Sequence, residues 1–371
     1  MAWSWPSAAR RGGVGRDGSF NAGSLSLESP CALVWARRDG TVERYSGAEL
    51  TTLARRTAGA LRSIGVRAGD RVAGLLGRRP EGFTVPLALW QLGAIFVPLF
   101  SGFRSEAIRT RLEDSGTTIV VTDVDNRASL GEAEAGLGPL TVVVVDGRGS
   151  DGDLSLSPLL ERATADAGLA ATSSRDPAAI MYTSGTSGPP KGCVIPHHGV
   201  LALWPYVEHC LELSPGDVLF STADIGWSFG LYTTGLSPLS LGGTRLLYEG
   251  AFEPAGWWSA IRSLGVTHLA SAPTGFRQLA HAGESHVESG IGALRSLTSA
   301  GETLNPEAIQ WFEDRLGVTI CDSYGLTELG MVITNRGRPG SPPPAPGSMG
   351  MPLPGFEVVL ASDEGEPDNR L

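Results

Sequence analysis

The stretch YTSGTSGPPKG, residues 182–192, decides which fold this sequence encodes. It combines glycines, hydroxyl side chains and a lysine, as phosphate-binding loops do. Two prolines stand directly before Lys191, however, whereas a Walker loop needs its lysine in the first turn of a helix, where backbone N–H groups bind phosphate. Lys191 is the only lysine of the chain, and every other basic residue except histidine is arginine. The stretch therefore predicts a loop between two strands that wraps an anion, rather than a P-loop kinase or ATPase; a solvent-exposed Gly/Ser linker is the structural alternative.

Strand-like and helix-like segments alternate on both sides of this loop. Before it, the sequence predicts helices over 46–65 and 81–93 and strands over 32–36, 71–76, 94–100, 117–123 and 140–146. From the loop onwards it predicts strands over 178–184, 217–222, 244–249, 266–272, 296–301 and 318–325, with helices between them. Short apolar runs of this kind are typical of strands buried on both faces. The alternation predicts an α/β fold of two subdomains with mainly parallel sheets flanked by helices.

Composition divides the chain into three parts. Residues 1–30 are rich in Gly, Ser and Arg and predict a flexible N-terminal arm. Residues 31–345 form the large α/β domain with its two subdomains. Residues 346–371 contain the alternating stretch GFEVVLASDEG and predict the start of a small, β-barrel-like subdomain.

Charge and cysteine content exclude several classes of protein. The formal net charge of −10 argues against nucleic acid and anionic membranes as partners. The four cysteines form no C-x-x-C pair, so we expect neither a disulfide framework nor a structural zinc site. Arg10 and Arg11 are not followed by the apolar segment of a secretory signal, and no apolar run is long enough to span a membrane. These features predict a cytoplasmic protein.

At every position, residues 182–192 resemble the signature Y-T-S-G-T-[ST]-G-x-P-K-G of the adenylate-forming superfamily, which includes acyl-CoA synthetases, amino-acid adenylation domains and luciferases. Further motifs follow in the family's order, so that the resemblance covers most of the chain: ADIGW (223–227), SAGETLNPEA (299–308), DSYGLTELG (322–330) and GSMGMPLPGFEV (347–358). The acyl-CoA synthetase branch is the most similar. The resemblance implies that a carboxylic acid and ATP form an acyl-adenylate and pyrophosphate with Mg²⁺, followed by transfer to the thiol of coenzyme A.

The resemblance also assigns roles to individual residues. Contacts with ATP or AMP are expected from Thr183, Ser184, Gly185, Thr186, Ser187, Gly188, Lys191, Gly301, Glu302, Thr303, Asp322, Ser323, Tyr324 and Thr327. Catalytic roles are expected for Thr183, Thr186, Lys191, Thr327 and Glu328. The acyl pocket is expected at Trp227, Phe229, Gly230, Ser299 and Gly325. These residue types suit the chemistry, because an aromatic face stacks on adenine, hydroxyl groups bind phosphate, and the carboxylate of Glu328 holds Mg²⁺ against phosphate oxygens.

Two departures from the family pattern affect the expected activity. Acetate-specific relatives have a tryptophan after the adenine-stacking aromatic, whereas this chain has Gly325. We therefore expect an open pocket and a medium, long or bulky acyl acid, of the kind found in specialised-metabolite biosynthesis. The family also uses a second lysine on a mobile C-terminal domain. Because Lys191 is the sole lysine, we expect this chain to be an N-terminal domain that is weak or inactive alone.

Two other functions remain open from the sequence. One is an amino-acid or aryl-acid adenylation domain that loads the thiol of a carrier protein, for which Asp224 stands near the position that meets a substrate amino group. The other is a non-catalytic protein that binds a nucleotide or an acyl group.

Overall fold

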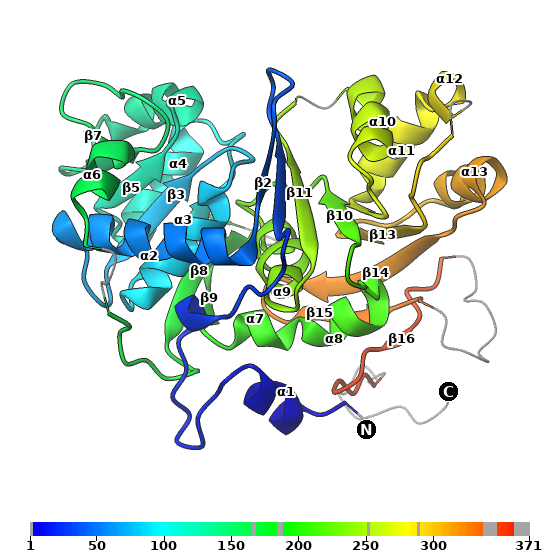
Figure 1. Cartoon of the computed structure of the whole chain (residues 1–371), viewed down its shortest axis with the longest axis horizontal. Coiled ribbons are helices and arrows are strands. Elements are labelled where there is room, and N and C mark those ends of the chain that lie inside the picture. Colours follow the sequence, from blue (N-terminus) through cyan, green and yellow to red (C-terminus); the bar gives the residue numbers. More distant parts are fainter. Residues whose placement is uncertain are drawn as a thin grey trace.

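A computed structural model of the chain describes residues 3–164, 168–183, 188–250, 253–287, 290–336 and 347–359. Two sheets dominate it, and Figure 1 shows them side by side with helices around and between them. The predicted α/β class with two mainly parallel sheets is confirmed. In the described part of the chain, no helix is long and apolar enough to cross a lipid bilayer.

The first sheet has seven strands in the order β7-β6-β5-β3-β4-β8-β9. Their bounds are β3 Arg71–Leu75, β4 Ile95–Leu99, β5 Ile119–Thr122, β6 Thr141–Val144, β7 Leu154–Ser155, β8 Pro177–Thr183 and β9 Lys191–Pro196. All neighbouring pairs are parallel except β8 and β9. The stretch 182–192 therefore joins two antiparallel strands, as predicted, and no helix follows the lysine directly.

The second sheet has nine strands in the order β16-β15-β14-β13-β12-β10-β11-β1-β2. Their bounds are β1 Leu33–Ala36, β2 Val42–Tyr45, β10 Val218–Ser221, β11 Thr244–Tyr248, β12 His268–Ser271, β13 Ser296–Ala300, β14 Ile320–Leu326, β15 Gly330–Thr334 and β16 Met351–Pro352. The strands from β14 to β11 and on to β1 are parallel, and the outer pairs are antiparallel.

Helices cover both faces of each sheet. The longer ones are α2 Gly47–Ser63, α3 Glu81–Gln91, α4 Ser105–Ser115, α5 Val124–Glu134, α10 Pro254–Ser263, α11 Pro273–His281 and α13 Pro306–Leu316. The shorter ones are α1 Trp5–Arg11, α6 Leu156–Arg162, α7 Gly199–Ala202, α8 Trp204–Tyr206, α9 Ser237–Ser240, α12 Glu284–Val287, the 3₁₀ turn η1 Ala22–Ser24 and the π-helices η2 Val207–Leu211 and η3 Phe229–Leu236. The predicted start of α2 is confirmed by a capping box, in which Ser46 Oγ accepts from the N–H of Glu49.

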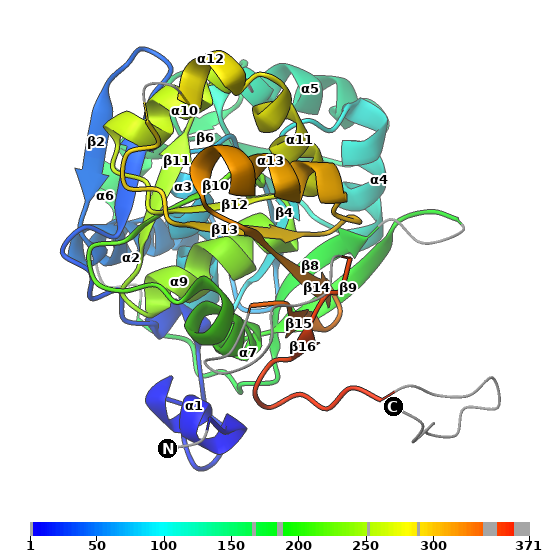
Figure 2. The ribbon, with the colours of Figure 1, turned by 90° about the vertical axis from the view of Figure 1, so that its right-hand side faces the viewer.

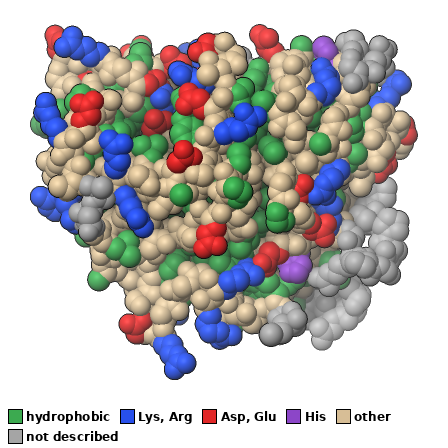
Figure 3. Space-filling model, in the orientation of Figure 1, with side chains coloured by type: hydrophobic (Ala, Val, Ile, Leu, Met, Phe, Trp, Pro, Cys, Tyr) green, Lys and Arg blue, Asp and Glu red, His purple; other side chains and the backbone are tan. Residues whose placement is uncertain are grey.

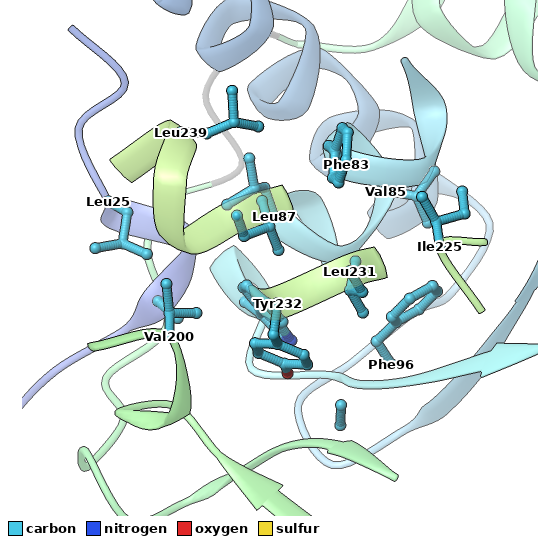
Figure 4. Packing of buried hydrophobic residues seen from close by; sticks show 14 of the residues in the cluster. Leu25, Phe83, Val85, Leu87, Phe96, Val200, Ile225, Leu231, Tyr232 and Leu239 are labelled. Carbon is cyan, nitrogen blue, oxygen red and sulfur yellow. The ribbon is translucent and has the colours of Figure 1, made fainter. Parts of the chain in front are cut away.

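Three hydrophobic clusters form the core of the described part of the chain. One lies between the second sheet and α10, α11 and α13, and another lies between the first sheet and α4 and α5. The largest joins the remaining faces of both sheets through α3 and η3, and Figure 4 shows Phe83 and Leu87 of α3 beside Leu231 and Tyr232 of η3. Because this central cluster takes side chains from both subdomains, the two sheets share one interior. On the surface, Figure 3 shows basic and acidic side chains interspersed over the face seen in Figure 1.

The two ends of the chain differ from the sequence-based expectation. The arm expected to be flexible contains α1, and Phe20, Ala22 and Leu25 are buried. Its high Gly and Ser content concealed these spaced apolar residues, which pack on the central cluster. At the other end, residues 347–359 add β16 to the second sheet, whereas 355–359 form no strand. Figure 2 shows β16 at the lower edge of that sheet, beside β15. The remainder of the predicted β subdomain lies outside the described residues.

Candidate active site at the facing strand ends

The carboxyl ends of the parallel strands of both sheets face each other. The Oγ1 of Thr183, at the end of β8, donates to Oε1 of Glu328 after β14, at 3.3 Å. The guanidinium of Arg78, after β3, donates to the carbonyl of Thr222 after β10, at 2.9 Å. In open α/β sheets, ligands bind outside the carboxyl ends of the strands. The seam between the two sheets is therefore the candidate site.

The described ends of the signature stretch, residues 182–183 and 188–192, belong to the first sheet at this seam. In the antiparallel β8–β9 pair, Thr183 stands directly across from Lys191. Gly188 has φ +114°, a conformation that favours glycine. Thr183 and Lys191 are thus cross-strand partners at the base of the loop. The predicted site residues Ser184, Gly185, Thr186 and Ser187 lie outside the described residues.

The motif YGLTE enters the seam from the second sheet. Alternation along β14 exposes Tyr324 and buries Ser323, whose hydroxyl donates to Thr334 Oγ1 at 3.1 Å. The structure therefore brings the aromatic ring of Tyr324 to the surface of the site but directs the hydroxyl of Ser323 into the interior. Thr327 is half-buried and Glu328 exposed in the turn to β15. Burial raises the pKa of the Asp322 carboxyl above its ordinary value.

The segment after β13 lies at the same edge of the second sheet. Gly301, Glu302 and Thr303 are exposed there, and Gly301 has φ +98°. The carboxylate of Glu302 accepts from Thr274 Oγ1 at 2.8 Å, which ties this segment to the start of α11. Within β13, Ser299 is fully buried, and its hydroxyl has no hydrogen-bond partner among the described residues.

Three aromatic side chains contact one another at the seam, after the ends of β4 and β10, and we call Phe100, Phe103 and Trp227 the aromatic cluster. The ring of Trp227 lies 5.6 Å from that of Phe100 and 5.9 Å from that of Phe103, and 39% of its surface is exposed. Sequence reasoning identified Trp227 but missed both phenylalanines. Their signal was the stretch FSGF at the carboxyl end of the strand predicted over 94–100, where the fold rule places ligand contacts.

Asp224 connects this cluster to the first sheet. Its carboxylate accepts from Ser101 Oγ at 2.6 Å and from the N–H of Gly226 at 2.7 Å. Asp224 is only 6% exposed, and burial raises the pKa of its carboxyl. Both oxygens are thus engaged within the chain, which leaves little of the carboxylate available to a substrate ammonium group.

Two glycines of the predicted acyl pocket lie so close to neighbouring backbone atoms that packing explains the absence of a side chain. A Cβ atom at Gly230 would lie 2.0 Å from the carbonyl oxygen of Asp224, and one at Gly325 would lie 2.4 Å from that of Gly330. Neither position therefore accepts a side chain without movement of the backbone. Phe229, the first residue of η3, is half-buried beside the central cluster.

The described side chains at the seam do not form a complete set of ligands for a magnesium ion. Among the described residues, no group of three or more His, Cys, Asp or Glu side chains is arranged to hold a metal ion. Mg²⁺ in nucleotide sites is usually held by one or two carboxylates together with phosphate oxygens. The exposed carboxylate of Glu328 beside the loop fits that mode of binding.

Comparisons with known proteins agree with this geometry. The family model for "AMP-binding enzyme" matches residues 29–370. Acetyl-coenzyme A synthetase of Bacillus subtilis (strain 168) is 32% identical over 343 residues, which are 89% of this chain and 57% of that protein. The acetyl-coenzyme A synthetase of Streptomyces avermitilis is 33% identical over 347 residues, covering 85% of this chain and 52% of the relative. This chain thus spans about half the length of the curated relatives that it matches.

Two solved structures extend the comparison. The crystal structure of an acyl-CoA synthetase of Brucella canis has a TM-score of 0.91 and 34% identity, and the match covers 99% of this chain and 68% of that one. An anthranilate CoA ligase in complex with anthranoyl-AMP has a TM-score of 0.85 and 25% identity, with 95% and 68% covered.

Proposed function

Because the chain belongs to the AMP-binding enzyme family, we propose that it is the part of an AMP-forming acid–thiol ligase that activates a carboxylic acid with ATP. The contact between Thr183 and Glu328 carries the proposal, since it joins the two motifs that would hold the phosphates and their metal ion. The substrate carboxylate oxygen would attack the α-phosphorus. The bond from that phosphorus to the bridging oxygen of pyrophosphate would break, leaving an acyl-adenylate. The thiol sulfur of coenzyme A would then attack the acyl carbonyl carbon and lose its proton, and AMP would leave as the thioester forms.

The residues of the seam would act by position and charge rather than as nucleophiles. Thr183, Thr186 and Lys191 would bind the phosphates of ATP from the loop, and Thr327 would donate to the α-phosphate. Glu328 would hold Mg²⁺, which offsets the charge on the phosphate oxygens. The exposed ring of Tyr324 would stack on adenine, next to the segment Gly301–Thr303. No covalent enzyme intermediate is needed.

We propose that the acid is larger than acetate. Gly325 stands where acetate-specific members of the family have tryptophan, and the aromatic cluster presents the partly exposed face of Trp227 to the seam. The relatives named as acetyl-coenzyme A synthetases favour a short acid, whereas the neighbour that holds anthranoyl-AMP favours an aromatic one. The engaged carboxylate of Asp224 favours an acid without an amino group at this position, and hence argues against amino-acid adenylation.

Two further parts of the proposal concern the setting of the reaction. A reducing compartment such as the cytoplasm suits the four cysteines, which are all unpaired thiols. Slow turnover is expected from these residues alone, because the family's second, catalytic lysine has no counterpart in a chain whose single lysine is Lys191.

Binding of acyl-adenylate analogues tests the proposal directly. Acyl-sulfamoyladenosines with acetyl, octanoyl, benzoyl and aminoacyl groups would be titrated into the chain by calorimetry. We expect the octanoyl or benzoyl compound to bind more tightly than the acetyl compound, by about tenfold or more, since each buried methylene contributes about 0.8 kcal/mol. Equal affinity for all four would contradict the acid preference, and no binding of any would contradict adenylation.

Pyrophosphate exchange tests the role of Glu328. The Glu328→Gln variant should lose exchange by about a hundredfold, because the amide oxygen is a weaker Mg²⁺ ligand than a carboxylate. Glu313→Gln, on the exposed face of α13, is the matched control and should exchange as the unchanged chain does. If slow turnover hides exchange, the Mg²⁺ dependence of ATP binding replaces it as the readout.

A further inference from the structure

Helix α4 supplies a second set of contacts behind the signature loop. It follows directly after Phe103 of the aromatic cluster, and its last turn carries Arg111 and Asp114. Neither residue belongs to a motif singled out in the sequence. Both contact Tyr182, the first residue of the signature stretch.

Asp114 anchors the base of the loop through a hydrogen bond. The hydroxyl of Tyr182 donates to Asp114 Oδ2 at 2.6 Å, and the ring of Tyr182 is buried. Tyr182 pairs across the strands with Gly192, and a Cβ there would lie 3.5 Å from the tyrosine ring. The ring therefore covers the backbone next to Lys191. Through Tyr182, Asp114 fixes the place where Lys191 leaves the sheet.

Arg111 lies between the loop and the aromatic cluster. Its guanidinium carbon is 4.1 Å from the centre of the Phe103 ring and 5.5 Å from that of Tyr182. The side chain is 7% exposed, its Nη1 donates to the carbonyl of Ala107, and its Nε has no hydrogen-bond partner among the described residues. Because this buried cation is held mainly by the two aromatic faces, a shift of one ring should be transmitted to the other. Phe103 in turn contacts Trp227.

We propose that Arg111 and Asp114 are positioning residues, which set the β8–β9 hairpin and its lysine relative to the aromatic cluster of the acid pocket. The part of this inference that concerns nucleotide binding rests on the proposed function. The contacts Asp114–Tyr182 and Tyr182–Arg111–Phe103–Trp227 then form a continuous path from the phosphate loop to the acid side. Changing Arg111 or Asp114 displaces Lys191 without removing a group that is proposed to touch a substrate.

The single lysine provides a specific probe of this hairpin. An endoproteinase that cleaves only after lysine cuts this chain at one peptide bond, between Lys191 and Gly192. That bond lies at the start of β9, so cleavage requires the end of the hairpin to open locally. The cleavage rate of the ligand-free chain measures the opening. The ATP concentration that halves the rate measures nucleotide binding at the same place.

Four variants test the anchoring. Tyr182→Phe removes only the hydroxyl, and Asp114→Ala removes its acceptor; each should speed cleavage about tenfold, the factor expected for a hydrogen bond to a charged group. The double variant should be no faster than Tyr182→Phe alone, because that change already removes the hydroxyl that donates to Asp114 and to the carbonyl of Arg111. Asp114→Asn keeps an acceptor oxygen and should restore most of the protection. Unchanged cleavage in both single variants would overturn the role of Asp114.

Arg111→Met tests the link to the acid side, with Arg109→Met as the matched control on the same helix. Arg109 donates to the carbonyls of Glu132 and Ala133 and so faces α5. Arg111→Met and Phe103→Leu should each speed cleavage severalfold, and their effects on the cleavage rate should not add in the double variant. Each should also raise the ATP concentration for half-protection about threefold or more. Equal effects of Arg111→Met and Arg109→Met would overturn the proposal. If ATP never protects the unchanged chain, the proposed function fails, while the ligand-free rates still decide the anchoring.

Discussion

Replacing His197 with asparagine should make the stability of the chain less sensitive to acid. The N–H of Ala22 donates to Nδ1 of His197 at 3.1 Å, so this nitrogen carries no proton. The ring is 1% exposed, and burial lowers its pKa from 6.5 to about 4. Protonation would place a charge in the interior and break the bond that holds the N-terminal segment to the core.

The magnitude follows from the two pKa values. Between pH 6.5 and about pH 4 the unfolded chain binds a proton at this position and the folded chain does not. The stability due to neutral His197 is therefore complete above pH 6.5 and falls as the pH drops towards 4. At about pH 5 the loss amounts to about 2 kcal/mol of the free energy of unfolding. Burial lowers the pKa of His268 to about 4 as well, which adds a loss in the same window that the variant retains.

Urea denaturation at about pH 7.5 and about pH 5 measures the effect. The Oδ1 of asparagine can still accept from Ala22, so His197→Asn should fold, with a lower free energy of unfolding at the higher pH. Its loss of stability on acidification should be about 2 kcal/mol smaller than that of the unchanged chain. His198→Asn, at the exposed neighbouring histidine, is the control for the substitution itself. The same pH dependence in the unchanged chain and in His197→Asn would refute the reasoning.

Three further changes test other parts of the structure. Asp224→Ala should lower the free energy of unfolding by about 1–3 kcal/mol, measured by urea denaturation, because it removes the buried acceptor of Ser101 and Gly226 and leaves half-buried Arg78 without its nearby carboxylate. Gly325→Ala should cost about 1–3 kcal/mol in the same assay, since the new Cβ meets the backbone of Gly330; stability equal to that of the unchanged chain would show that β14 and β15 can separate freely. Trp227→Ala should weaken binding of a benzoyl-adenylate analogue, measured by calorimetry, about tenfold, while ATP still protects Lys191 from proteolysis. Equal loss of analogue binding and of ATP protection would place Trp227 outside the acid pocket.

Local patterns predicted most of the central fold. The strands over 71–76, 94–100 and 296–301 appear in the structure within one or two residues, because runs buried on both faces leave a clear apolar signal. The N-terminal arm was misjudged, since its buried residues, polar as well as apolar, are held by partners far away in the sequence. Asn21, for example, donates to the carbonyl of Trp90. No local pattern reports a contact over such a separation.

The sequence predicted the motifs of the candidate site one by one, but not how their side chains lie relative to one another. Sequence reasoning identified Thr183 and Glu328, and the structure adds that their side chains meet. It missed Phe100, Phe103, Arg111 and Asp114, which come from the segment between β4 and α4 and from α4 itself and carry no motif of their own. Their relevance depends on how two sheets are packed together, and one sequence without tertiary information does not specify that packing. The glycine at 325 was interpreted as an open pocket wall, while its close approach to Gly330 depends on a bulge between β14 and β15.

Because each half of the sequence supplies strands to both sheets, a cut in the middle of the chain should not separate the two halves. Strands β1 and β2 come from the first half of the sequence but complete the second sheet, and β9 begins at Lys191 and completes the first. A single cut after Lys191 would therefore produce two interlocked fragments, each of which supplies strands to the other's sheet. Such fragments should copurify after the nick and separate only in denaturant. Expressed as two polypeptides, residues 1–191 and 192–371 would be suited to a split-protein reporter, in which reassembly restores the seam where ATP is expected to bind.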